Sequence, residues 1–148
     1  MRVLLVVPPR LLWPFMNEQD NFLLPQAIPC LAAAARNAGH EVEVLDCLPD
    51  KVGWRSLERE LRRRCPDVVA AGENHALYAS EAIKLVRLAK RVDPGVITVL
   101  GGAHFTNLAD RYLPDEPIDA IVRGEGEVTF AALLEALDGG DGLDGVLG

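Results

Sequence analysis

Glycines and polar side chains directly follow several apolar runs of this 148-residue sequence, in a pattern that suits ligand binding. The run "VITVLGGAHF" (Val96–Phe105) ends in Gly101 and Gly102, with Ala103 and His104 behind them. Because glycine has no Cβ, backbone at two adjacent glycines can lie directly against a flat or bulky ligand. A tight turn between a strand and a helix is the alternative explanation. His104 is a candidate ligand contact, metal ligand or polar helix start.

A second loop, "GENHALY", also carries polar side chains behind an apolar run. It begins at Gly72 and places Glu73, Asn74 and His75 before a predicted helix. These three side chains are candidates for hydrogen bonds to a ligand. Asn74 is equally suited to cap the following helix with its side-chain oxygen. A cap needs only one of the three residues, so Glu73 is the stronger indication of a ligand.

A third loop, "RGEGE", places Gly124 and Gly126 around Glu125, with Glu127 in the first turn of a predicted helix. A helix N-terminus preceded by glycines can receive a phosphate. Two carboxylates repel that charge, so a hydroxyl-bearing group such as a ribose suits this loop better. Glu127 also interacts favourably with the helix dipole when no ligand is present.

Recognised catalytic motifs are absent from the sequence. It contains no GxGxxG after its first apolar run, no GxxxxGK[ST] and no GxSxG. No nucleophile and base can be paired among the loops, so we assign no catalytic residue. Cys30, Cys47 and Cys65 are widely spaced and favour reduced thiols over an iron–sulfur site or a disulfide framework. We predict no metal site.

The elements that must position these loops alternate regularly between strands and helices. Strands are predicted at Arg2–Val7, Glu41–Asp46, Pro66–Gly72, Val96–Gly102 and Ile118–Gly124. Helices are predicted at Gln26–Gly39, Trp54–Arg64, Ala76–Val92, Thr106–Tyr112 and Glu127–Leu137. This alternation predicts an α/β fold, a doubly wound five-stranded parallel sheet of flavodoxin-like (Rossmann-like) order 2-1-3-4-5 with helices on both faces. Ligands of such sheets bind beyond the carboxyl ends of the strands, where these loops lie.

The length indicates one domain, which we place at residues 1–137. Residues 138–148 are rich in glycine and are expected to be a linker toward a catalytic domain outside this sequence. A net charge of −7 argues against a nucleic-acid partner. No apolar run has the length of a membrane span or the build of a signal peptide, which predicts a cytoplasmic protein without membrane contact. The long apolar segment from Pro8 to Pro25 is expected to cover a ligand or a partner.

Taken in order, these segments resemble the N-terminal cobalamin (vitamin B12)-binding domain of cobalamin-dependent radical S-adenosylmethionine (SAM) enzymes. The matching segments are "VLLVVPP", "LAAAARNAGHEVEVLD", "PDVVAAG", "AKRVDPGVITVLGGAHFT" and "IDAIVRGEGEVTFAALLEAL". They cover residues 2 to about 137. The combination of "VLGGAH" with "IVRGEGE" some twenty residues later is the most specific part of the match.

The resemblance implies how cobalamin would lie on this chain. The corrin ring would rest on the carboxyl edge of the sheet, with Pro8 and Pro9 at its rim. The nucleotide tail would pass between sheet and helices along Gly101 to His104, with Gly72 to His75 beside the ring or tail. Gly124 to Glu127 would face the ribose and base of the tail.

The resemblance also implies what the chain lacks. The DxHxxG motif, whose histidine binds cobalt from below in other cobalamin proteins, is absent after the first strand, so cobalamin is expected base-off and without that ligand. SAM and a [4Fe–4S] cluster would belong to a downstream radical SAM domain with a CxxxCxxC motif. The chain would then be non-catalytic alone, serving methyl transfer or cobalamin-assisted cyclisation. The alternatives are a stand-alone cobalamin carrier for a methyltransferase and a flavodoxin-like regulatory domain without a cofactor.

Overall fold

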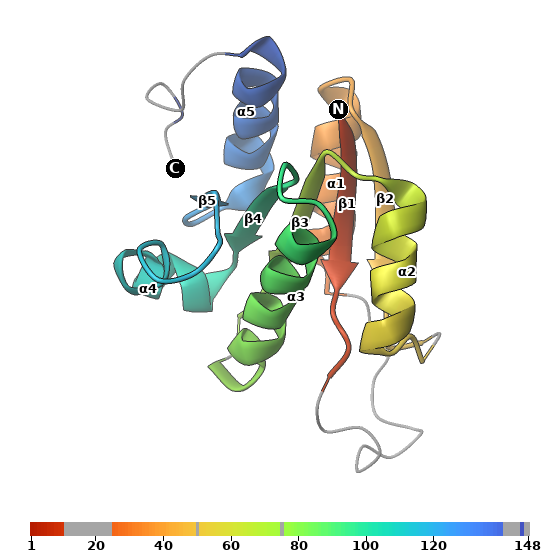
Figure 1. The fold of residues 1–148 in the computed structure, drawn as a ribbon. Helices are drawn as coiled ribbons and strands as arrows, with labels where there is room; N and C mark the ends of the chain where they lie inside the picture. Colours follow the sequence, from red (N-terminus) through yellow and green to blue (C-terminus); the bar gives the residue numbers. More distant parts are fainter. Residues whose placement is uncertain (11–24, 50, 75, 141–145, 147–148) are drawn as a thin grey trace.

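The computed structural model describes residues 1–10, 25–49, 51–74, 76–140 and 146 of the chain. In these residues five strands alternate with five α-helices, and one short 3-10 helix precedes α3 (Figure 1). The strands are β1 (Arg2–Val7), β2 (Glu41–Asp46), β3 (Val68–Gly72), β4 (Ile97–Gly101) and β5 (Ala120–Ile121). The helices are α1 (Ala27–Asn37), α2 (Trp54–Arg64), η1 (Ala76–Tyr78), α3 (Ala79–Val92), α4 (Ala103–Tyr112) and α5 (Gly126–Gly139). None of the described helices is long and apolar enough to cross a membrane.

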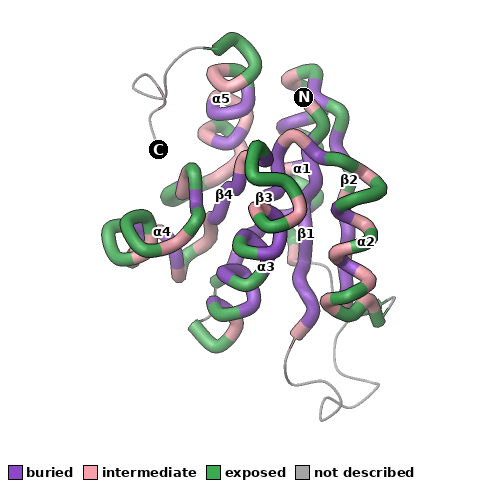
Figure 2. Tube along the Cα trace, in the orientation of Figure 1, coloured by how far each residue is buried: buried purple, intermediate pink, exposed green. Residues whose placement is uncertain are grey.

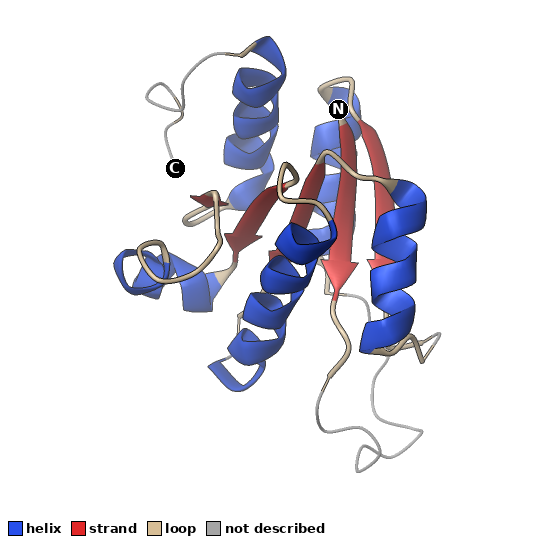
Figure 3. Ribbon diagram, viewed as in Figure 1, coloured by secondary structure: helices blue, strands red, loops and turns tan. Residues whose placement is uncertain are grey.

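The strands form one sheet in the order β2-β1-β3-β4-β5, and every neighbouring pair is parallel (Figure 3). Val3 in β1 pairs with Val42 on one side and with Val68 on the other. The predicted doubly wound sheet and its strand order are therefore confirmed. The order reverses between β1 and β3, because the chain leaves β1 toward β2 on one side and returns to β3 on the other.

Alternate residues of β1 face two separate apolar cores, because successive strand side chains point to opposite faces. Val3, Leu5 and Val7 pack into the core formed with α1 and α5. Leu4 and Val6 pack into the core formed with α2, α3 and α4. All five side chains are buried, and Figure 2 shows β1 as an almost continuously buried strand.

Helix α1 ends at Asn37, and Gly39 forms its C-terminal cap as the sequence predicts. Gly39 has a φ of +90°, and its N–H donates to the Arg36 carbonyl at 3.0 Å. The next N–H, of His40, donates to the Ala35 carbonyl at 3.1 Å. These two bonds form a Schellman motif, which satisfies carbonyls that the end of the helix leaves without partners.

Only α2 has its predicted bounds: α1 is shorter at both ends, and α3 begins three residues late, after η1. Helix α4 begins at Ala103, three residues before the predicted Thr106, and its backbone departs from helical geometry at Leu108 (φ −124°, ψ 18°). Helix α5 runs from Gly126 to Gly139, two residues past the predicted end at Leu137. It therefore includes the first two residues of the segment predicted as a linker.

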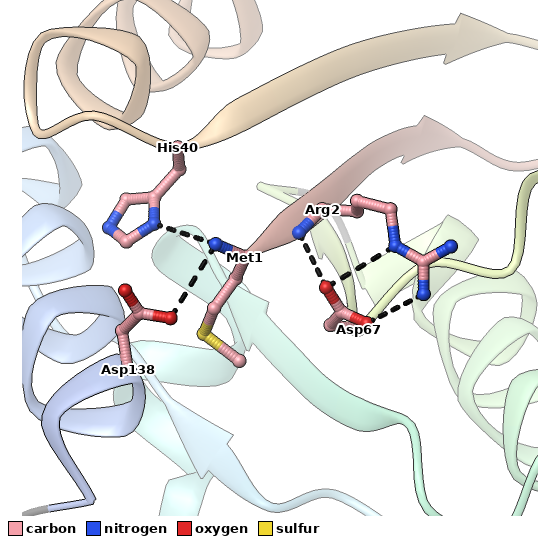
Figure 4. A network of polar contacts seen from close by, with 5 residues as sticks. All are labelled: Met1, Arg2, His40, Asp67 and Asp138. Carbon is pink, nitrogen blue, oxygen red and sulfur yellow. Dashed lines mark hydrogen bonds and ion pairs between the residues drawn. The ribbon is translucent and has the colours of Figure 1, made fainter.

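Polar contacts tie the amino-terminal end of the sheet together (Figure 4). Asp67 precedes β3 and accepts the Arg2 backbone N–H at 2.6 Å and the Arg2 guanidinium at 2.8 Å. The ammonium of Met1 lies 3.4 Å from His40 Nδ1 and 3.6 Å from Asp138 Oδ1. The charged groups of this network lie at the opposite end of the strands from the loops that the sequence singles out.

Candidate functional site

A cavity of about 140 Å³ opens at the carboxyl ends of β3 and β4, between the sheet and helices α1 and α5. Its apolar walls come from both layers and include Leu5, Ile28, Leu31, Val99, Val122 and Phe130. Its rim is formed by the predicted loops: Gly72 and Asn74, Gly101 and Gly102, and Gly124 to Glu127. The cavity thus combines an apolar interior with a rim of glycine backbone and polar side chains.

The two glycines after β4 serve different purposes. Gly102 has a φ of +90° and ψ of 168°, a backbone region populated almost only by glycine. A Cβ on Gly102 would lie 2.5 Å from the Glu73 carbonyl oxygen, whereas a Cβ on Gly101 would lie 3.4 Å from its nearest neighbour, the Val122 carbonyl. Gly102 is therefore required by the close approach of the Glu73 backbone, independently of any ligand.

Asn74 connects the β3 loop to the start of α4. Its side-chain oxygen accepts the Ala103 N–H at 3.0 Å, and α4 has no cap from its own preceding residue, Gly102. The Glu73 backbone makes two further bonds across the same junction, donating to the Gly101 carbonyl at 2.9 Å and accepting the His104 N–H at 3.2 Å. The sequence predicts that Asn74 binds a ligand or caps the helix that follows it. In the structure it caps a helix 29 residues away.

The loop before α5 borders the other side of the cavity. Glu125 is the N-cap residue of α5 but makes no side-chain capping bond, and it is exposed to solvent. Glu127 lies in the first turn, where a carboxylate interacts favourably with the helix dipole. The Gly124 N–H donates to Thr106 Oγ1 at 3.1 Å, a support that the sequence did not indicate. A Cβ on Gly126 would lie 3.1 Å from Leu31, so glycine lets α1 and α5 meet closely here.

Several predicted site residues lie outside the cavity lining. Pro8 and Pro9 are buried at the end of β1. Ala103 and His104 begin α4, and His104 Nε2 lies 3.1 Å from the Tyr112 hydroxyl on the same helix. His75 falls outside the described residues. Within the described part of the chain, no three His, Cys, Asp or Glu side chains gather as a metal site.

Two residues that the sequence did not single out lie beside Glu73. The Arg10 guanidinium is 3.3 Å from Glu73 Oε2 and stacks on the Tyr78 ring, with Arg10 Cζ 3.6 Å from the ring centroid. Glu73 itself is buried, at 5% exposure. The sequence pattern does not mark Arg10 as a site residue, because Arg10 stands in an apolar segment. A buried carboxylate needs a cation nearby, but the burial of Glu73 is visible only in the folded structure.

Comparisons with known proteins show the family to which the chain belongs. A model of the B12 binding domain matches residues 16–134. An uncharacterized methyltransferase of Pyrococcus horikoshii is 32% identical over 100% of this chain and 32% of its own length. The anaerobic magnesium-protoporphyrin IX monomethyl ester cyclase of Rubrivivax gelatinosus is 33% identical over 78% of this chain and 21% of its own length. The hopanoid C-3 methylase of Methylococcus capsulatus is 32% identical over 85% of this chain and 24% of its own length.

The chain thus spans about a third or less of the length of these relatives. The match to the B12 binding domain, by contrast, extends over most of the chain, including the ends of β3 and β4 and the start of α5 that border the cavity. The family resemblance drawn from the sequence is confirmed, and the chain belongs to the B12-binding domain family.

Proposed function

We propose that this chain binds cobalamin with the corrin ring over the carboxyl edge of the sheet and the nucleotide tail in the cavity between the sheet, α1 and α5. The cavity is the observation that carries the proposal. Its apolar walls suit the flat aromatic base at the end of the tail, and its rim of backbone and small residues suits a chain of ribose and phosphate passing over it.

The rim residues take distinct parts in this proposal. Gly72, Gly101 and Gly102 leave backbone free of side chains on one side of the tail. The loop from Gly124 to Glu127 lies on the other side, where its carboxylates would accept hydrogen bonds from the ribose hydroxyls. Pro8 and Pro9, which follow β1, would lie under the rim of the ring. The parts proposed for Asn74 and His104 are indirect, since Asn74 positions α4 and His104 is bonded within it.

The residues after β1 include no DxHxxG histidine, so the chain would bind cobalamin without that cobalt ligand. The chain there is Pro8, Pro9 and Arg10, none of which coordinates cobalt as histidine does. We expect affinity to come from burial of the tail and ring, with the cobalamin base-off. The visible absorption of the bound cofactor reports this directly, because loss of the axial base shifts its bands.

Cobalamin supplies a transferable methyl group or an electron-transfer centre when it is bound. In this proposal the chain's own residues bind and orient the cofactor, and a radical SAM domain of the parent protein, with SAM and a [4Fe–4S] cluster, performs methyl transfer or cyclisation. The relatives support this assignment, since two are named as a methyltransferase and a methylase and one as a cyclase, and all are much longer. Sequencing the gene beyond codon 148 tests it, because a radical SAM domain requires a CxxxCxxC motif.

The binding proposal is tested by titrating the chain with hydroxocobalamin while recording visible absorption and the melting temperature. A ligand that binds only the folded state raises the melting temperature, by an amount that grows with its concentration relative to Kd. We expect both a base-off spectrum and a concentration-dependent rise. An unchanged spectrum together with an unchanged melting temperature would overturn the proposal.

A further inference from the structure

Arg10 is held in one orientation by two neighbours at the carboxyl edge of the sheet. Its guanidinium lies 3.3 Å from Glu73 Oε2 and 3.6 Å above the Tyr78 ring. Only 13% of the Arg10 side chain and 6% of the Glu73 side chain are exposed. The ion pair with Glu73 and the stacking on Tyr78 restrict the side-chain rotamers of Arg10 before any ligand binds. Arg10 can therefore bind a ligand at a low cost in conformational entropy.

One nitrogen of this arginine is not satisfied. Arg10 Nη1 is buried and makes no hydrogen bond with the described residues, although its distance to Glu73 is that of an ion pair. A buried donor without an acceptor is unfavourable, and charged donors more so. An acceptor that arrives with a ligand would remove this cost.

The position of Arg10 is where a doubly wound sheet binds ligands. Arg10 follows β1 and Glu73 follows β3, and these two strands are neighbours between which the strand order reverses. The helices that follow the two strands lie on opposite faces of the sheet, α1 after β1 and α3 after β3 (Figure 1). The crevice between such diverging loops is the usual ligand site of this architecture.

The charge of the pair indicates what kind of acceptor fits. Glu73 largely neutralises Arg10 at short range, which weakens the attraction for a phosphate and leaves a directed donor for a neutral oxygen. Corrin rings carry such oxygens in the amide side chains around their periphery. We propose that Arg10 anchors the corrin ring by donating from Nη1 to one of these amide oxygens, with Glu73 and Tyr78 as positioning residues. This inference rests on the proposed cobalamin site.

The test measures Kd for two ligands, hydroxocobalamin and cobinamide, a corrinoid without the nucleotide tail. Arg10→Met removes the donor, and we expect Kd to rise roughly 10- to 100-fold for both ligands by nearly the same factor. Arg10→Lys keeps the positive charge but not the planar guanidinium, and we expect an intermediate loss of affinity for both ligands. The control is Arg87→Met. It removes an exposed arginine of α3 that is hydrogen-bonded to Glu116, and we expect both Kd values to stay unchanged.

Removing Arg10 takes away the cation that lies 3.3 Å from the buried Glu73 carboxylate, which by itself can destabilise the fold. The double variant Arg10→Met/Glu73→Gln avoids this cost, and its melting temperature without ligand separates a folding defect from a binding defect. Wild-type affinity for cobinamide in the folded double variant would overturn the inference, as would a loss confined to hydroxocobalamin. If the wild-type chain binds neither ligand, the proposed cobalamin site itself is wrong.

Discussion

The Asn74 side-chain oxygen and the Ala103 backbone N–H are joined by a 3.0 Å hydrogen bond that links the end of β3 to the start of α4. The first N–H groups of a helix have no partner within it, and Gly102, which precedes α4, has no side chain to supply one. The position of α4, and with it the Gly101–Gly102 rim of the cavity, therefore depends on a residue from a different loop.

Replacing Asn74 with alanine should lower the free energy of unfolding by about 1 kcal/mol, because the Ala103 N–H loses its acceptor. For a chain of this size that corresponds to a fall in melting temperature of roughly 3 °C. Asn74→Asp keeps an acceptor oxygen, so its free energy of unfolding should fall by less. Asn107→Ala is the matched control, since Asn107 bonds the Ala103 carbonyl within α4 and is exposed. Equal losses for Asn74→Ala and Asn107→Ala in urea or thermal melts would contradict this role.

Gly102→Ala should destabilise the protein by roughly 2–3 kcal/mol, because the added Cβ meets the Glu73 carbonyl at 2.5 Å in a backbone conformation that only glycine adopts easily. Gly124→Ala is the comparison. Gly124 also has a positive φ, of +69°, but a Cβ there has no atom within 4 Å. The free energy of unfolding of Gly124→Ala should fall by only about 1 kcal/mol, the cost of placing alanine at a positive φ. Unfolding midpoints that fall equally for the two variants would show that the contact with Glu73 is unimportant.

Gly72→Leu should weaken cobalamin binding at least tenfold while leaving the fold intact. Gly72 borders the cavity, and a Cβ there has open space around it and no positive φ to oppose it, so the larger side chain occupies the ligand's position. Gly53→Leu is the matched control, because Gly53 has the same open surroundings but lies before α2, away from the cavity. Both variants should melt near the wild-type temperature. Visible titration showing wild-type affinity for Gly72→Leu would contradict the proposed path of the tail.

Acid should destabilise the protein through two aspartates. Hydrogen bonds from the Arg2 side chain and backbone lower the pKa of Asp67 below its ordinary value. Burial raises the pKa of Asp119, but bonds from Lys90 and Thr98 outweigh that effect and lower it overall. A carboxyl whose pKa is lower in the folded state stabilises fully above its unfolded pKa, about 3.9, and loses that contribution as the pH falls through the folded value.

The melting temperature should therefore fall as the pH is lowered from about 6 to 3, and Asp67→Asn should show a smaller fall. The Arg2–Asp67 pair is partly exposed, so the difference is modest and should shrink further at high salt (Figure 4). Asp110→Asn, which removes an exposed carboxylate from α4, is the control. An acid profile of Asp67→Asn identical to the wild type would show that this pair does not contribute.

The strand order was predictable from the sequence because apolar runs of strand length alternate with amphipathic helices, and few topologies satisfy that pattern. The glycine at the end of α1 was predictable for a local reason, since it follows directly on the last turn. The start of α4 was not predictable, because its capping oxygen belongs to Asn74 and sequence patterns only show nearby caps. The rim glycines were found, but the pattern could not separate Gly102, which a neighbouring backbone requires, from Gly101. Arg10 was missed because its partners, Glu73 and Tyr78, come together only in the folded chain.

Alternate side chains of β1 belong to two cores on opposite faces of the sheet, and only one of these cores borders the cavity closely. Leu5 is part of the cavity wall and belongs to the core under α1 and α5, whereas Leu4 belongs to the core under α2 and α3. In the proposed binding mode the cofactor tail would lie between the sheet and helices α1 and α5, on the side away from the core under α2 and α3. Loading and release of the cofactor would then disturb packing only on the α1 and α5 side, and the core under α2 and α3 would keep the domain folded.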